Sequence, residues 1–167
     1  MTKPRQQLEA AVLRHSIANT WEQARQEWDV IGLQDATGEC VCTQDNLRWL
    51  YTISNRHNGN TLHPIGSDCI DHFRQESMTV KAKTLADYQA LCAIHRARGI
   101  TLSDLKPNRL RSLWRMNCLP KTRWNHGDVV TDYKFLMDMA RRRKSMTPKQ
   151  EVKVDILLRS VAKFLER

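Results

Sequence analysis

Glu39-Cys40-Val41-Cys42 and Ile65-Gly66-Ser67-Asp68-Cys69-Ile70 enclose the stretch on which the fold depends. Between them, residues 47–54 alternate apolar and more polar side chains, a pattern typical of a β-strand. Asn58-Gly59 follows and readily adopts the positive φ angles of a tight turn, so residues 61–65 can return as a partner strand. The predicted hairpin therefore brings Cys69 back beside the two earlier cysteines.

Three converging thiols predict a metal site, because Zn²⁺ binds four sulfur or nitrogen ligands in a tetrahedron. No fourth cysteine lies nearby in the sequence, so the fourth ligand is expected to be a histidine, an acidic side chain or water. His72, three residues after Cys69, and His63, on the return strand, are equal candidates. The alternative is that the thiols of Cys40, Cys42 and Cys69 pack the hairpin without a metal. We favour a structural Zn²⁺ site.

Outside the hairpin, apolar residues recur at three- and four-residue steps, which is typical of amphipathic helices. Helices are predicted over residues 8–28, 84–99, 108–117 and 132–143, and from residue 148 onward. Thr147-Pro148-Lys149-Gln150 combines a capping box with a proline in the first turn. Residues 29–38 are expected to form a loop or short strand, and residues 75–83 a linker. We therefore predict an α+β fold, mostly α, divided into residues 1–74 and 84–167 or compact as a whole.

The formal net charge of +9 is concentrated in one half of the chain. Residues 1–83 contain 9 Lys+Arg and 10 Asp+Glu, whereas residues 84–167 contain 18 and 8, a balance of +10. Such asymmetry indicates an anionic partner for the second half, most commonly nucleic acid. The alternative is a set of solvated helix faces without a partner.

The cations of the second half fall into three groups. Arginines alternate with inward-facing leucines on helix 108–117, a loop combines cations with a tryptophan that could stack on a base, and a cationic run ends helix 132–143. The tryptophan could equally cover the edge of the core, and cations at a helix end also offset the helix dipole. The residues predicted to contact nucleic acid are Arg109, Arg111, Arg115, Lys121, Arg123, Trp124, Arg141, Arg142, Arg143 and Lys144.

The sequence offers little support for catalysis or membrane insertion. It has no Gly-rich phosphate loop, paired-carboxylate constellation or nucleophile motif, and three thiolates make zinc a poor Lewis acid, so no catalytic residues are predicted. The first residues contain no apolar signal segment, and no apolar run is long enough to span a bilayer. The five cysteines are an odd number. We expect a cytoplasmic protein with reduced thiols and no membrane partner.

The hairpin residues resemble a family of small, mostly uncharacterised proteins of bacteriophages, prophages and mobile elements that are described as zinc-ribbon-like. The likeness rests on Cys-x-Cys (residues 40–42), Tyr-x-Ile-x-Asn-Arg-x-x-Gly (residues 51–59), Ile-Gly-Ser-x-Cys-Ile-x-x-Phe (residues 65–73) and the segment 132–139. It covers roughly residues 28–165, and Thr43-Gln44 departs from the glycine associated with many relatives. The resemblance implies a zinc-ribbon-like hairpin and no enzymatic mechanism. Together with the helical and charge patterns, we expect a short zinc-ribbon-like β-hairpin packed with a basic helical bundle.

Two functions are consistent with these features. The first is nucleic-acid binding, DNA binding included, in which the basic C-terminal helices contact phosphates largely independently of sequence. The second is a protein-interaction module that binds or inhibits a host protein, such as a host-takeover or counter-defence factor. The resemblance favours this second function. We favour nucleic acid, because a charge asymmetry of this size predicts salt-dependent phosphate binding. A phage-derived protein would act in the cytoplasm of a bacterial host.

Overall fold

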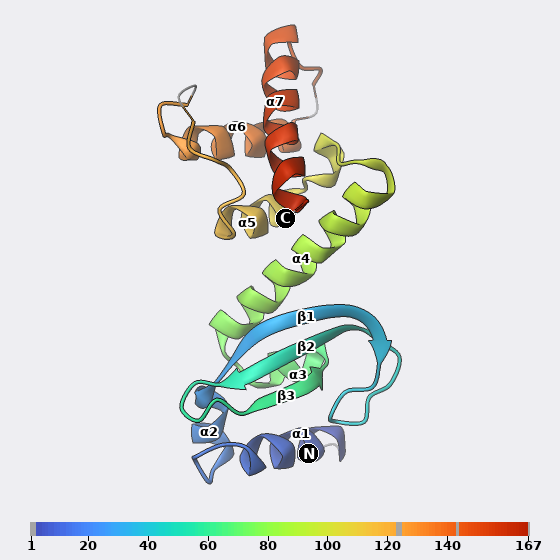
Figure 1. Ribbon diagram of the computed structural model, residues 1–167, viewed down its shortest axis with the longest axis vertical. Coiled ribbons are helices and arrows are strands. Elements are labelled where there is room, and N and C mark those ends of the chain that lie inside the picture. Colours follow the sequence, from blue (N-terminus) through green and yellow to red (C-terminus); the bar gives the residue numbers. More distant parts are fainter. Residues whose placement is uncertain (1–2, 123–124, 143, 167) are drawn as a thin grey trace. The chain divides into compact units, whose positions relative to one another are not determined.

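A computed structural model describes residues 3–122, 125–142 and 144–166 (Figure 1). The protein is mostly helical with a small antiparallel sheet, which confirms the predicted α+β class. The chain divides into two compact units, Met1–Ala86 and Asp87–Arg167. Each unit has a hydrophobic core of its own.

The first unit is built on a three-stranded antiparallel sheet in the order β1-β2-β3. Its strands are Trp28–Gly38 (β1), Leu47–Asn55 (β2) and Thr61–Ile65 (β3). Strands β2 and β3 form the predicted hairpin, with Tyr51 opposite Ile65. Gly59 follows the turn at a φ of +74°, a conformation that glycine adopts without steric strain.

Strand β1 differs from the prediction of a loop or short strand over residues 29–38. It is eleven residues long and pairs with β2 from Trp28 opposite Asn55 to Gly38 opposite Leu47. Register irregularities interrupt the pairing after Val30 and after Asp35. Such bulges break the two-residue alternation of side chains, which explains why the sequence pattern is weak there.

The predicted single helix over residues 8–28 is wrong. The structure contains three short elements instead, Lys3–Arg14 (α1), Trp21–Ala24 (α2) and the 3₁₀ turn Arg25–Glu27 (η1). The carboxylate of Glu27 accepts hydrogen bonds from the backbone N–H groups of Ile17 and Ala18, at 2.9 and 2.8 Å. These bonds hold the chain in a bend after α1, and neither a proline nor a glycine marks that bend in the sequence.

Helix α3 (Ser67–His72) follows β3 directly and completes the core of the first unit. This core unites residues from α1, all three strands and α3. Its fully buried side chains include Leu8, Val12, Trp28, Val30, Ile53, Ile65 and Phe73. Burying a large apolar side chain typically contributes about 1.5–3 kcal/mol, so this core stabilises the packing of α1 and α3 against the sheet.

Helix α4 (Glu76–Arg98) begins eight residues before the predicted start at residue 84. The expected linker over residues 75–83 therefore lies mostly in a helix. Thr84 is an interior residue of α4 rather than its N-cap, and its hydroxyl donates to the carbonyl of Val80 at 2.8 Å. This local bond lets threonine occupy a helix interior. Gly99 ends the helix with a φ of +76°, as predicted.

The second unit contains the last part of α4 and the remaining helices. These are Leu102–Asp104 (η2, a 3₁₀ turn), Pro107–Arg115 (α5), Val129–Arg141 (α6) and Pro148–Leu165 (α7). The predicted capping box is confirmed, because Thr147 accepts from the Gln150 N–H while the Gln150 side chain accepts from the Thr147 N–H. Helices α4 to α7 share a core that includes Leu91, Leu105, Leu110, Leu113, Leu136 and Val161.

Candidate functional site

The structure brings together the three cysteines that the sequence predicts as metal ligands. Cys40 and Cys42 lie in the loop after β1, and Cys69 lies on α3. Their Sγ atoms are within 4.8 Å of one another, and all three residues are buried. A tetrahedral zinc with Zn–S bonds of about 2.3 Å places its sulfurs about 3.8 Å apart. The three thiols could therefore hold a metal ion without large rearrangement.

Backbone hydrogen bonds hold the two loop cysteines in place. The Val41 N–H donates to the carbonyl of Pro64 at 3.0 Å and ties the loop to β3. The Thr43 N–H donates to the Cys40 carbonyl at 2.7 Å and closes a turn in which Thr43 has a φ of +69°. The loop that carries the Cys-x-Cys pair is thus fixed by main-chain contacts as well as by the burial of its thiols.

Gly66 contributes a backbone hydrogen-bond donor to the cysteine cluster. The sequence pattern does not predict this role. The Gly66 N–H lies 3.2 Å from the Sγ atom of Cys40. A Cβ atom at this position would be 2.7 Å from Cδ1 of Leu47, so a larger residue would displace that side chain. The only sequence signal for this role is the Ile-Gly-Ser turn just before α3.

The pKa values of the three thiols are shifted in different directions. The hydrogen bond with the Cys69 thiol lowers the pKa of Cys40 to about 5, and the backbone N–H groups of Cys42 and Gly66 act in the same direction. Hydrogen bonding to Cys40 raises the pKa of Cys69, and burial raises the pKa of Cys42. The Cys69 thiol and two N–H donors therefore stabilise a thiolate at Cys40, whereas further negative charge at this buried site requires a cation, which a metal ion would supply.

The two histidines considered as the fourth ligand lie apart from the thiols. His72 Nε2 is 2.9 Å from Glu9 Oε1, and its ring stacks on Trp21 with a centroid separation of 5.1 Å. His63 Nδ1 is 2.9 Å from Thr52 Oγ1 at an exposed position. Within the described residues, the metal-ligand cluster contains the three cysteines alone. The i, i+3 spacing could not reveal the partners of His72, because they come from α1 and α2.

The cations predicted to contact nucleic acid are distributed over three segments of the second unit. Arg111 and Arg115 are exposed on α5, whereas Arg109 is half-buried and donates to the Asp104 carbonyl at 3.1 Å. Lys121 is exposed in the loop before α6. Arg141, Arg142 and Lys144 are exposed at the end of α6 and beyond, and Arg142 donates to Gln150 Oε1 at 2.8 Å. Arg123, Trp124 and Arg143 lie outside the described residues.

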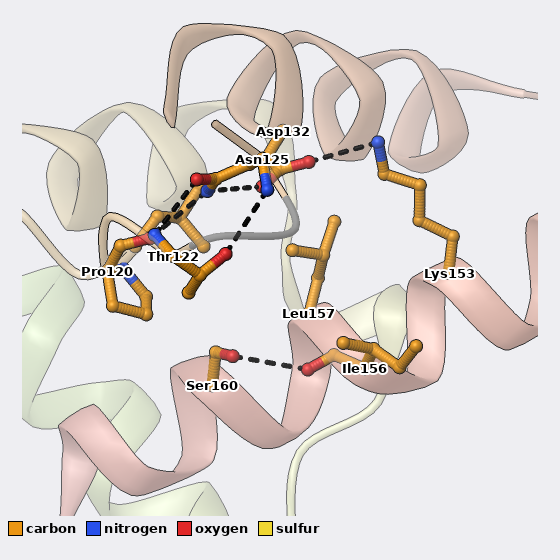
Figure 2. Close-up of a pocket in the computed structure, with 9 residues that line it drawn as sticks. Pro120, Thr122, Asn125, Asp132, Lys153, Ile156, Leu157 and Ser160 are labelled. Carbon is orange, nitrogen blue, oxygen red and sulfur yellow. Dashed lines mark hydrogen bonds and ion pairs between the residues drawn. The ribbon is translucent and has the colours of Figure 1, made fainter. Parts of the chain in front are cut away.

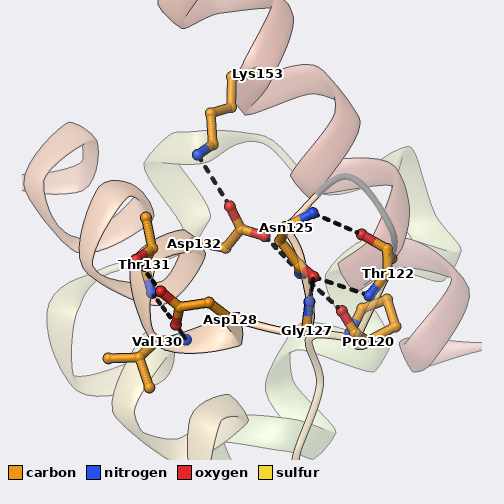
Figure 3. Close-up of polar contacts among 9 residues, drawn as sticks. All are labelled: Pro120, Thr122, Asn125, Gly127, Asp128, Val130, Thr131, Asp132 and Lys153. Atoms are coloured by element: carbon orange, nitrogen blue, oxygen red, sulfur yellow. Dashed lines mark hydrogen bonds and ion pairs between the residues drawn. The ribbon is translucent and has the colours of Figure 1, made fainter.

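Asn125 organises the loop between α5 and α6 (Figure 3). Its Oδ1 accepts from the N–H groups of Thr122 and Gly127 at 2.9 and 3.0 Å. Its Nδ2 donates to the Pro120 carbonyl at 3.2 Å and to Asp132 Oδ2 at 2.9 Å. A single amide side chain thus bonds to Pro120, Thr122 and Gly127 of the loop and links them to the first turn of α6.

A cavity of about 640 Å³ lies between this loop and helix α7 (Figure 2). Leu119 and Pro120 line it from the loop, and Ile156 and Leu157 line it from α7. Its acidic group, Asp132, pairs with Lys153 Nζ at 3.0 Å. The sequence pattern does not predict this cavity, because its walls come from the loop before α6, from α6 and from α7, which are separated in the chain.

Comparison with known proteins identifies no family for this chain. Among the described residues, no helix combines the length and the apolar character needed to cross a membrane. No protein-family model, curated protein or solved structure matches the chain.

Proposed function

We propose that this chain is a zinc-stabilised nucleic-acid-binding protein. Zn²⁺ bound by Cys40, Cys42 and Cys69 would hold together the loop after β1 and helix α3, and exposed cations of α5 and of the segment that ends α6 would contact phosphates. Zinc suits a buried thiolate cluster, because it accepts sulfur ligands, has no redox chemistry and stabilises folds by joining distant segments. With three protein thiolates, water or another small ligand would complete the tetrahedron.

The distribution of unpaired cations carries the nucleic-acid proposal. Arg111 and Arg115 lie four residues apart and therefore on the same side of α5, while Leu110 and Leu113 are buried. Within the described residues, neither arginine forms an ion pair. Like charges so placed repel one another in the free protein, and phosphates would relieve that repulsion.

The acidic residues of the second unit do not offset its charge. Residues 87–167 contain 18 Lys+Arg and 8 Asp+Glu. Two of these acids form ion pairs with Arg or Lys of the same unit, Asp104 with Arg98 at 2.6 Å and Asp132 with Lys153 at 3.0 Å. The excess of exposed cations supports binding that is mainly electrostatic and only weakly dependent on base sequence.

Binding of labelled oligonucleotides over a range of salt concentrations tests this function. The full-length protein, freed of copurifying nucleic acid, should bind single- or double-stranded oligonucleotides of unrelated sequence with similar affinity. The logarithm of the affinity should fall linearly with the logarithm of the salt concentration. Absence of measurable binding to DNA and RNA at low salt would refute the proposal, whatever the metal content of the protein.

A further inference from the structure

Helix α7 exposes a surface that is both apolar and basic. Val152 and Ile156, about one turn apart, are 60% and 56% exposed. At 3.6 residues per turn, Lys149, Arg159 and Lys163 project from the same side of the helix, and all three are exposed. We call these five residues the α7 face. The buried residues of α7 lie on the opposite side, so this face does not contribute to the core of the unit.

The apolar part of this face continues into the cavity beside α7. Ile156 belongs to the α7 face and also lines the cavity, together with Leu157 and Ser160 of the same helix (Figure 2). Leu119 and Pro120 form the facing wall. A volume of about 640 Å³ lies within the range of cavities that bind ligands and can accept large apolar side chains.

The polar groups at the cavity are already satisfied by one another. Asp132 Oδ1 pairs with Lys153 Nζ at 3.0 Å, and Asp132 Oδ2 accepts a hydrogen bond from Asn125 Nδ2 at 2.9 Å. The Ser160 hydroxyl donates to the Ile156 carbonyl at 3.2 Å. Because these groups have partners, an occupant need not supply hydrogen bonds to them. The cavity therefore suits an apolar group better than a polar one.

The charges around the face indicate the kind of partner. Within the described residues, Lys149, Arg159 and Lys163 form no ion pair. A second copy of this chain would bring the same cations against them, which is unfavourable. A nucleic acid would neutralise the cations but would leave Val152 and Ile156 without an apolar partner. An acidic segment with apolar anchors would match both features.

We propose that the α7 face binds an acidic segment of a partner protein, which places a large apolar side chain in the cavity beside Ile156. This inference does not depend on the nucleic-acid proposal, because it concerns different residues from Arg111, Arg115 and the cations after α6. It supplies an observation in favour of the protein-interaction function.

A random-peptide display selection against the full-length protein tests the proposal. The protein is compared with two variants of the face, Ile156→Asp, which places a carboxylate at the anchor position, and Ser160→Trp, which fills the cavity. Ile31→Asp is the matched control, because Ile31 is 55% exposed on β1 in the first unit. Circular dichroism and thermal melting establish that each protein is folded. If Ile156→Asp does not fold, Ser160→Trp and Val152→Asp replace it.

The proposal expects enriched peptides that carry large apolar residues flanked by Asp or Glu. Their affinity should fall about tenfold or more for each face variant, the size of effect typical of an interface hot spot, and should be unchanged for Ile31→Asp. Failure to enrich such peptides, or equal binding to the wild type and the face variants, would overturn it. It would also be overturned if the same variants weakened single-stranded oligonucleotide binding tenfold and left peptide binding intact, because the face would then be a nucleic-acid surface.

Discussion

The Sγ atoms of Cys40 and Cys69 lie 3.6 Å apart, although 29 positions separate the two residues in the chain. The hairpin of β2 and β3 spans this interval and returns the chain to its starting point. Gly66 directly precedes α3, and its backbone N–H donates to the same Cys40 sulfur. A metal ion at this point would connect the loop after β1 to α3, which would stabilise the first unit by restricting both segments.

The first prediction concerns the metal. Cys42→Ser should remove stoichiometric zinc and lower the melting temperature, because a serine hydroxyl is a poor zinc ligand at a buried site. Cys118→Ser is the control, since Cys118 is equally buried and burial raises the pKa of its thiol to about 12, which keeps it protonated. Elemental analysis of untagged protein, with melting before and after chelation, is the measurement. Absence of zinc in the wild type, with melting insensitive to chelator, would end the metal hypothesis.

The second prediction separates a zinc ligand from a packing histidine. His72→Gln should retain zinc but lower stability by about 1 kcal/mol, because the variant no longer stacks on Trp21 and its contact with Glu9 is weaker. His63→Gln removes one exposed hydrogen bond to Thr52 and should change stability by less than about 0.5 kcal/mol. Zinc content and chemical denaturation of both variants decide the point. Loss of zinc in either variant would identify that histidine as the fourth ligand.

The third prediction concerns the buried carboxylate that bends the chain after α1. Burial alone would raise the pKa of Glu27, but hydrogen bonds from the Ile17 and Ala18 N–H groups and the Asn55 side chain lower it below the ordinary value. The carboxylate therefore stabilises the fold at pH values above the ordinary glutamate pKa. That stabilisation is lost as the pH falls toward the lower pKa of the folded state.

Glu27→Gln should reduce the free energy of unfolding at neutral pH by about 1–3 kcal/mol, because charged acceptors make stronger hydrogen bonds than neutral ones. The variant should also lose less stability on acidification than the wild type does. Denaturation at several pH values measures both effects. Glu22→Gln is the control, since the Glu22 side chain is 74% exposed. Parallel pH profiles for the wild type and Glu27→Gln would contradict the assigned role.

The fourth prediction concerns the exposed arginines of α5. Replacing Arg111 and Arg115 by Gln should weaken binding to oligonucleotides of any sequence, and the salt slope should decrease by about 0.7–0.9 for each phosphate that an arginine no longer neutralises. Folding should be little affected, because both side chains are exposed. The charge-matched control replaces Arg5 and Arg14, which are exposed on α1. An equal decrease in affinity for the two double variants would show a general charge effect and not a specific binding surface.

The sequence alone determined the parts of the protein that local chemistry controls. Period-two alternation and Asn58-Gly59 identified the hairpin, and the capping box at Thr147 identified the start of α7. These signals act within a few residues, where backbone preference and side-chain caps decide the conformation. The spacing of the cysteines around the hairpin also predicted their convergence, because a hairpin brings the residues before its first strand close to those after its second strand.

Only the tertiary structure decided the features that depend on distant partners. Glu27 bends the chain after α1 through hydrogen bonds with residues about ten positions earlier, so the continuous helical pattern of residues 8–28 was misleading. Glu9 and Trp21 engage His72, which its spacing from Cys69 had suggested as a ligand. The cavity beside Ile156 arises where a loop held by Asn125 meets α7. In each case the stabilising free energy comes from packing and hydrogen bonds between segments that are distant in the sequence. Sequence periodicity does not predict such contacts, because it indicates which face of an element is buried and not which element covers that face.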